Sequence, residues 1–233
     1  MTASQPAAVP AANLRWVHAP LQARTREGLV RLLEAAEQCI AEKGYEESSI
    51  AAIAQRAGTS VGGFYRRFRD KDGVIQALHE RFCEDSRATA DDALAPSRWE
   101  GASLASVVQE FTAFLVEIYR EREGLLRAFL ARAHSDAVMR DRTHALLDHL
   151  ARRLSALLRS RRDEFGHPDP ERAAVFGLQL VLSTLNCNVL IPPQPVSLHD
   201  RDFAGELSHA LASYLGVRPA KPVRLSTAKR RKS

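Results

Sequence analysis

The sequence predicts an all-α fold in two parts, with short helices over about residues 24–85 and longer helices over about residues 100–216. Three observations lead to this prediction. Apolar residues recur at three- and four-residue steps through most of the chain, which is the period of a helix with one buried face. Glycine, proline and the capping residues serine and aspartate separate these apolar runs. No segment shows the strict alternation of apolar and polar residues that is typical of a strand.

The first helix is expected from about residue 24 to residue 43. Its apolar positions share one face: Leu29, Leu32, Leu33, Ala36 and Ile40. Gly44 follows the last turn, where glycine commonly ends a helix.

Two short helices and the start of a third helix are predicted next. Ser48 or Ser49 can cap the first short helix, and Gly58 ends it. Ser60 can cap the second short helix, and Asp70 can cap the helix that follows. The inward positions of these helices are Ile50, Ile53, Ala54, Ala57, Phe64, Phe68, Val74, Ile75, Leu78 and Phe82.

The second part opens after a loop between Asp91 and Gly101. A broad apolar face covers about residues 104–118, and a further segment begins after Gly124. A long leucine-rich helix over about residues 146–158 stops at the sequence Gly166-His167-Pro168.

Asp169 and Pro170 then form a strong helix start, a cap followed by a first helical residue. The next segment, residues 173–191, has no charged residue and approaches the length of a membrane span. Polar residues interrupt it at Gly177, Gln179, Ser183, Thr184, Asn186 and Asn188, and polar amides are costly in lipid. We therefore expect a helix buried on most sides in a soluble protein, ended by Pro192. A last helix, from about residue 201 to residue 215, closes at Gly216.

Composition favours a reducing compartment. The 233 residues contain three widely separated cysteines, an odd number with no CxxC pair: Cys39, Cys83 and Cys187. Small buried hydrophobic residues are the favoured interpretation, with a redox-sensing thiol as the alternative.

The two ends of the chain differ from the rest. Residues 1–23, rich in alanine and proline, lack the pattern of a secretory signal and are expected to form a disordered arm. Residues 217–233 form a basic tail, with seven lysines and arginines and no acidic residue from Arg218 onward. Without those seven charges the net charge of +5 becomes −2, so the folded body is close to neutral. The tail either attracts a phosphate polymer or is simply a solvated terminus.

The two short helices with a glycine-containing turn between them predict a helix-turn-helix at about residues 48–68, of which the second helix is the candidate recognition helix. Phe64 and Phe68 supply its buried anchor. Its other face offers Gly62, Gly63, Arg66 and Arg67. Tyr65 and Lys71 can donate to DNA phosphates.

The run "AEKGYEESSIAAIAQRAGTSVGGFYRRFRDKDGVIQAL" resembles the DNA-binding domain of the TetR family of transcriptional regulators (TetR/AcrR type). It contains the Gly44-Tyr45 step, the hydroxyls of Ser48 and Ser49, and the pattern IAxxAGxSxGxFYxxFxxK. The resemblance covers about sixty residues. It implies a larger, variable helical C-terminal domain that binds a ligand and forms the dimer.

The resemblance also implies roles for single residues. Ser49 and Thr59 would face DNA phosphates at helix starts, and Ser60 would cap the recognition helix. Positions that face base edges in the family correspond to Gly62, Gly63 and Arg67, and its phosphate-clamping pair corresponds to Tyr65 and Lys71. Val61 replaces a residue that is often polar, and either touches a thymine methyl or packs inward. With two glycines in the helix, Arg66 and Arg67 are expected to be the chief readers of sequence.

For the C-terminal part the resemblance implies that the last two helices pair with those of a second copy in a four-helix bundle. One stripe of polar residues, Gln179, Ser183 and Asn186, bonds either a small ligand or the dimer partner, with the dimer favoured. Phe111, Phe114, Phe129 and Leu130 either line an apolar ligand pocket or simply pack the core, and core packing is favoured. The histidines His134, His144 and His149 form no metal-ligand set with carboxylates or cysteines.

These observations predict a cytoplasmic, nucleoid-associated bacterial regulator, a homodimer that binds palindromic operator DNA. We expect a repressor that a small apolar or amphipathic effector releases. The sequence has no P-loop, G-x-S-x-G or H-E-x-x-H motif, so we expect no cofactor and no enzymatic activity. Two alternatives are a ligand-independent nucleoid-type DNA binder, and a helical enzyme or carrier with a vestigial motif.

Overall fold

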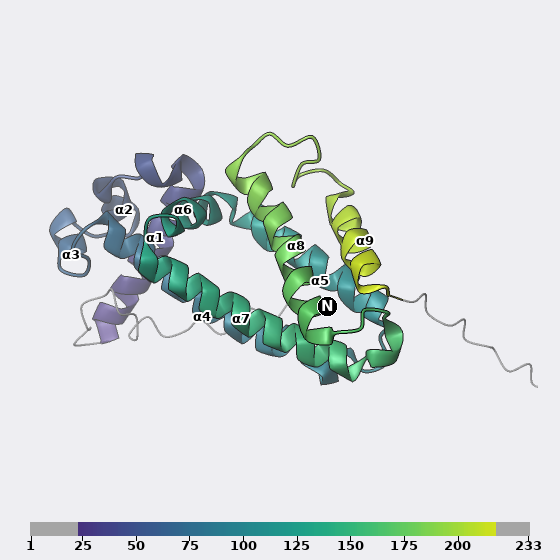
Figure 1. The fold of residues 1–233 in the computed structure, drawn as a ribbon. Helices are drawn as coiled ribbons and strands as arrows, with labels where there is room; N and C mark the ends of the chain where they lie inside the picture. The colour runs from purple at the N-terminus through teal and green to yellow at the C-terminus, as the bar shows by residue number, and fades with distance from the viewer. Residues whose placement is uncertain (1–22, 218–233) are drawn as a thin grey trace, which may run out of the picture.

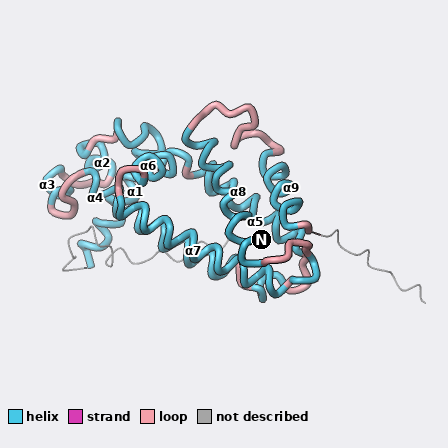
Figure 2. The backbone as a smooth tube through the Cα atoms, in the orientation of Figure 1, coloured by secondary structure: helices cyan, strands magenta, loops and turns pink. Residues whose placement is uncertain are grey.

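The structure, a computed structural model, describes residues 23–217 (Figure 1). The expected N-terminal arm and basic tail lie almost entirely outside these residues. The all-α fold is confirmed: within the described range, pairing of extended backbone is limited to an isolated bridge between Phe165 and Val217, and Figure 2 shows helices joined by loops.

Three helices form the N-terminal end: α1 (Ala23–Glu47), α2 (Ile50–Arg56) and α3 (Val61–Tyr65). Gly44, with φ 81° and ψ 166°, interrupts α1 where the sequence predicts its end, and a short turn continues to Glu47. Ser49, rather than Ser48, caps α2: its hydroxyl accepts from the Ala52 N–H at 3.1 Å. The Ser48 hydroxyl instead donates to the Gly44 carbonyl at 2.7 Å.

Helix α4 (Lys71–Ala93) starts at the predicted cap, where Asp70 accepts from the Gly73 N–H at 2.8 Å. It then runs well past residue 85, where we expected the first domain to end. No glycine or proline interrupts the sequence between Gly73 and Pro96, and the buried residues Ala90 and Leu94 extend the core face. Helix α4 therefore connects the two parts of the chain as one rigid element.

The next segment has a short 3₁₀ helix, η2 (Pro96–Trp99), followed by α5 (Leu104–Glu121) and α6 (Glu123–Ala133). Gly124 lies inside α6, whereas the sequence suggested that it precedes the helix. A Cβ at this position would lie 3.0 Å from the Ala41 Cα and 3.1 Å from the Ile40 carbonyl oxygen. The absence of a side chain at Gly124 thus allows α6 to pack closely on α1.

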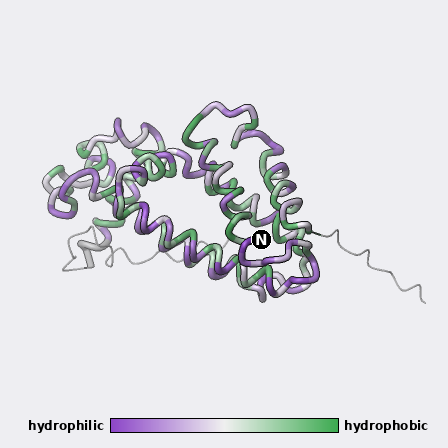
Figure 3. The backbone as a smooth tube through the Cα atoms, viewed as in Figure 1, coloured by the Kyte–Doolittle hydropathy of each residue, from purple (hydrophilic) through white to green (hydrophobic). Residues whose placement is uncertain are grey.

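Helix α7 (Ala137–Ser160) packs along α4, and both run between the two ends of the molecule (Figure 1). Figure 3 shows hydrophobic and hydrophilic residues alternating along α7, as an amphipathic helix requires. The helix ends six residues before Gly166, and a 3₁₀ turn, η3 (Arg162–Glu164), fills the interval.

The last two helices are α8 (Pro170–Leu190) and α9 (Phe203–Leu215), which pack on each other and on α5. Asp169 caps α8 by accepting from the Arg172 N–H at 3.0 Å, and Gly216 ends α9 with φ 64°, both as predicted. Of the described helices, α8 is the one long and apolar enough to cross a membrane. It is buried on one face, including Ala173, Leu178 and Val181, but Val175 and Phe176 on its other face are 55% and 48% exposed. The expectation that α8 is buried on most sides is therefore not met within a single chain.

The described cysteines fall into two groups. Cys39 and Cys83 are buried, as expected for small core residues, and burial raises the pKa of the Cys83 thiol to about 12. Cys187 is exposed on α8 and does not fit that expectation.

Candidate nucleic-acid interface

Helices α2 and α3 form a helix-turn-helix anchored by two aromatic rings. The side chains of Phe64 and Phe68 are fully buried, with ring centroids 5.6 Å apart. Ser60 caps α3 as predicted, since its hydroxyl accepts from the Gly63 N–H at 3.0 Å. The turn between the helices contains Gly58 with φ 65°, a left-handed conformation that favours glycine.

The outer face of α3 is exposed, and Gly62 leaves part of it without a side chain. Val61 and Tyr65 are 43% and 52% exposed, and Gly62 and Arg66 are exposed as well. A Cβ at Gly62 would meet nothing closer than the Ser60 hydroxyl at 3.8 Å. Because Val61 points outward, the inward-packing alternative for this residue does not hold.

Gly63 occupies a different environment from Gly62. It is buried, and a Cβ there would collide with the Thr59 hydroxyl. The structure therefore does not present Gly63 on the exposed face where the sequence placed it. Its missing side chain instead lets the half-buried Thr59 close the turn against α3.

Arg67 is also placed differently from the expectation. Its Nη1 donates to the Gly63 carbonyl oxygen at 3.1 Å, and its guanidinium packs so closely on α1 that a Cβ at Gly28 would collide with it. Burial, followed by the charges of Arg66 and Arg31, lowers the pKa of Arg67. In this conformation Arg67 connects α3 to α1, and Arg66 is the arginine that α3 exposes.

Lys71 lies at the first turn of α4, beside the end of α1. Its ammonium donates to the carbonyl oxygens of Tyr45 at 2.8 Å and Glu46 at 3.2 Å. Cations are favoured at such a helix C-terminus because the last carbonyl groups lack partners within the helix. The remaining predicted residue, Ser49, is exposed at the start of α2.

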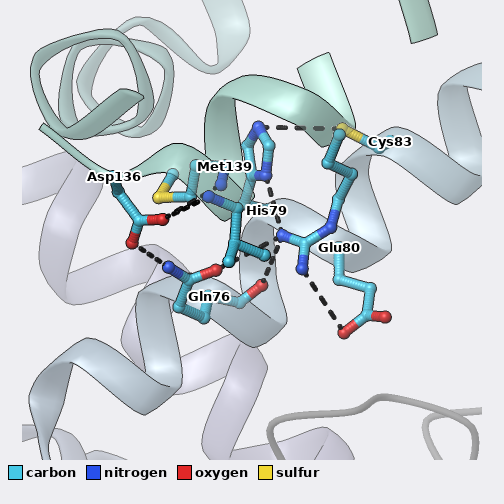
Figure 4. Close-up of polar contacts among 8 residues, drawn as sticks. Gln76, His79, Glu80, Cys83, Asp136 and Met139 are labelled. Carbon is cyan, nitrogen blue, oxygen red and sulfur yellow. Dashed lines mark hydrogen bonds and ion pairs between the residues drawn. The ribbon is translucent and has the colours of Figure 1, made fainter. Parts of the chain in front are cut away.

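A buried polar cluster joins α4 to α7, which the sequence did not reveal (Figure 4). The His79 ring accepts at Nδ1 from Arg142 at 3.0 Å and lies with Nε2 3.1 Å from the Thr143 hydroxyl. The Thr143 hydroxyl itself donates to the Met139 carbonyl, so Nε2 carries the proton and the ring is neutral. In the same cluster the side-chain amide of Gln76 on α4 donates to the carboxylate of Asp136, the residue that caps α7. The available signal was the i, i+3, i+4 spacing of Gln76, His79 and Glu80, which puts three polar residues on one helix face, and all three are buried.

The four predicted apolar ligand residues differ in burial. Phe129 is buried and packs edge-on against His79, with ring centroids 5.0 Å apart. Phe111 is half-buried, and Phe114 is 44% exposed on α5. Leu130, half-buried, packs against the core.

The polar stripe on α8 is divided in the same way. Gln179 and Ser183 are exposed, on the face that also carries Val175 and Phe176. Asn186 instead turns inward, where its Oδ1 accepts from the Tyr119 hydroxyl at 2.7 Å. Within the described range, no three His, Cys, Asp or Glu side chains are grouped so that they could hold a metal ion.

An all-α chain that presents an exposed short helix on a helix-turn-helix defines the class of helix-turn-helix transcriptional regulators. Two family models assign the chain within this class. Residues 32–78 match bacterial regulatory proteins of the tetR family, and residues 103–215 match the tetracyclin repressor-like C-terminal domain, so that the two together cover more than half of the sequence. The chain belongs to the TetR family of transcriptional regulators.

Similar proteins agree with this assignment. An uncharacterized HTH-type transcriptional regulator of Mycobacterium tuberculosis is 26% identical over 187 residues, which cover 79% of this chain and 93% of that protein. A putative TetR-family regulator from Mesorhizobium loti has a similar solved structure, with a TM-score of 0.66 at 18% identity, covering 84% of this chain and all of that one. FadR from Bacillus subtilis, solved in complex with stearoyl-CoA, has a TM-score of 0.60 at 18% identity and covers 82% of this chain and all of FadR. At these identities the solved structures establish a shared fold.

Proposed function

We propose that this regulator is a homodimeric repressor that binds palindromic operator DNA through α3 and is released by a small apolar or amphipathic effector. The observation that carries the proposal is the outer face of α3. Val61, Gly62, Tyr65 and Arg66 are exposed together, on a helix that Phe64 and Phe68 hold rigidly on the core. A bare helix face next to exposed cationic and phenolic groups suits close approach to a DNA groove.

Within this proposal the predicted residues divide into base-facing and phosphate-facing groups. Gly62 lets the backbone approach the groove floor, and Arg66 reads base edges. Arg67 reads bases only after leaving its contacts with Gly63 and Gly28. Phosphates are contacted by the helix-start residues Ser49 and Thr59 and by Tyr65 and Lys71, while Ser60 caps α3. Gly63 contributes by closing the turn.

The exposed apolar face of α8 supports a dimer. Val175, Phe176, Leu190 and Ile191 are all between 45% and 64% exposed. Large apolar side chains gathered on one face favour a protein partner. A second copy that covers this face and α9 would also bury Gln179 and Ser183, which favours the dimer over a ligand for these two residues.

An effector acts by binding better to the dimer form whose recognition helices are wrongly spaced for successive major grooves. The relative FadR was solved with stearoyl-CoA, an amphipathic molecule, which supports this effector class for the present chain. The body over about residues 100–216 is its proposed site, with Phe111, Phe114 and Phe129 as candidate apolar contacts and Asn186 as a candidate polar one. The head over about residues 24–85 binds DNA, and the protein acts in the bacterial cytoplasm on the nucleoid, without catalysing a reaction.

Selection of bound sequences from a random DNA pool tests the proposed function. A regulator enriches a palindromic sequence with two half-sites about one helical turn apart. The alternative, a nucleoid-type binder, would enrich no defined sequence and would show a steep loss of affinity with salt. That second result would overturn the repressor proposal.

A further inference from the structure

Two cations from different parts of the fold pack on the ring of Tyr45. The ammonium of Lys71, at the start of α4, lies 4.2 Å from the ring centroid. The guanidinium of Arg132, near the end of α6, lies 4.2 Å from the same centroid. Tyr45 itself is only 7% exposed. The buried ring therefore connects a residue of the body with the proposed phosphate contact of the DNA-binding head.

Asp72 forms a second connection between Tyr45 and Arg132. Its carboxylate accepts from the Tyr45 hydroxyl and from Arg132, whose Nη1 lies 2.7 Å from Oδ1. Asp72 is the residue after Lys71, so this negative charge lies close to the proposed phosphate contact. Arg132 neutralises it.

Lys71 retains capacity for a phosphate in this arrangement. An ammonium group has three N–H donors, and the bonds to the carbonyl oxygens of Tyr45 and Glu46 use two of them. The third can donate to a phosphate oxygen while the first two hold the side chain in place. A side chain fixed beforehand loses less conformational entropy on binding.

The corner between α6 and α7 is firmly connected to the head. Gly124 brings α6 into backbone contact with α1, and Asp136, just beyond α6, accepts from Gln76 on α4. Arg132 lies on α6, so its contacts with Tyr45 and Asp72 depend on where α6 lies against α1 and α4.

We infer that Arg132 is a positioning residue for the DNA contact of Lys71: it fixes the Tyr45 ring against which Lys71 lies and neutralises Asp72 beside it. The inference rests on the proposed DNA-binding role of Lys71. It makes phosphate binding by the head dependent on where the body places α6.

The first test is a double-mutant cycle in affinity for a selected operator sequence. Arg132→Gln is expected to weaken binding about three- to tenfold, the scale of one lost cation–ring contact. In a Lys71→Gln background the same change should weaken binding by a clearly smaller factor, because the contact that Arg132 positions is already absent and only the repulsion by Asp72 remains. Adding Asp72→Asn to Arg132→Gln should restore most of the affinity, because an amide oxygen still accepts from Tyr45 without repelling a phosphate.

Two further variants control this cycle. Arg140→Gln removes a charge from the same corner, at an exposed position whose contacts are the carbonyl oxygens of Ala133 and His134, and should leave affinity within about twofold. Arg132→Lys keeps a cation and should retain most of the affinity even if Arg132→Gln folds poorly. If the double variant lost operator affinity by the product of the two single-variant factors, the inference would be overturned.

The second test uses the free protein and no DNA. Pulsed acetylation, read by mass spectrometry, should modify Lys71 faster in Arg132→Gln than in the wild type, with the rate in Arg140→Gln unchanged. Equal rates in all three proteins would contradict the positioning role, whatever the DNA results. A faster rate combined with no sequence-specific binding by the wild type would instead overturn the proposed function and leave the link between Arg132 and Lys71 intact.

Discussion

The guanidinium of Arg67 donates to the carbonyl oxygen of Gly63 at 3.1 Å, four residues earlier in the chain. This bond directs the arginine back along α3 toward α1, whereas its neighbour Arg66 is exposed. Two adjacent arginines that look equivalent in sequence therefore have different surroundings. They should respond differently to substitution.

Arg66→Ala is expected to relax base specificity at one operator position, by about 1–3 kcal/mol, with little change in the free energy of unfolding. Arg67→Ala should lower operator affinity too, but it should also reduce the free energy of unfolding by about 1 kcal/mol, because it removes a hydrogen bond and packing against Gly28. Chemical unfolding and operator titration separate the two effects. Dimerisation should hold in both variants, and equal stability losses would contradict this distinction.

The two glycines of α3 should also differ. In Gly62→Ala the new methyl group enters open space and alanine favours the helix more than glycine does. The free energy of unfolding should therefore rise by up to about 1 kcal/mol, while operator affinity falls. Gly63→Ala should reduce the free energy of unfolding by about 1–3 kcal/mol, because the new methyl group collides with Thr59. Adding Thr59→Ala to Gly63→Ala should recover part of this loss in thermal unfolding. If Gly63→Ala proved as stable as Gly62→Ala, the packing role of Gly63 would be excluded.

Gly124→Ala tests the close contact between α6 and α1. The added methyl group would lie 3.0 Å from the Ala41 Cα and 3.1 Å from a backbone oxygen, which cannot rotate away. We expect a loss of about 1–3 kcal/mol in the free energy of unfolding. Gly62→Ala is the matched control, since its methyl group would meet nothing closer than the Ser60 hydroxyl at 3.8 Å. An increase in stability at both positions would show that the two helices are not in backbone contact.

Phe176→Glu should convert the proposed homodimer into a monomer, because it places a charge on the exposed face of α8 that the second copy would cover. Phe114→Glu is the control: that side chain is 44% exposed on α5, close to the 48% of Phe176. Sedimentation should show a monomer for the first variant and a dimer for the second. Operator affinity should fall with the loss of the dimer, and a dimeric Phe176→Glu protein would argue for another interface.

The buried histidine predicts how stability varies with pH. Burial, followed by the charge of Arg142, lowers the pKa of His79 from 6.5 to about 4, while Asp136 opposes the shift. Between these two values the unfolded chain binds a proton that the folded protein does not, so the free energy of unfolding rises with pH in this window. Acidification from pH 6.5 toward pH 4 should cost up to about 3 kcal/mol from this residue. Chemical unfolding at several pH values should show that the free energy of unfolding of His79→Gln depends less steeply on pH than that of the wild type. Equal slopes in the two proteins would contradict this account of His79.

Local sequence signals predicted the elements that local chemistry determines. The caps Ser60, Asp70 and Asp169 and the helix end at Gly216 depend on neighbouring residues only. The length of α4 was underestimated because its second half is held by packing against α7, which a single segment does not reveal. Burial of Gly63 and the inward turn of Arg67 likewise depend on α1 and the closed turn. Arg132, sixty residues from Asp72, lay beyond any pattern readable in the recognition motif.

The exposed face of α3 and the start of α4 form the proposed surface that reads a specific DNA sequence. Replacing Tyr65, Arg66, Arg67 and Lys71 together, and then footprinting the variant on the operator selected by the wild type, tests this proposal. We expect the footprint to disappear while the helical content and the dimer are retained. A footprint that persisted at the same sequence would contradict the assignment of the DNA-binding surface.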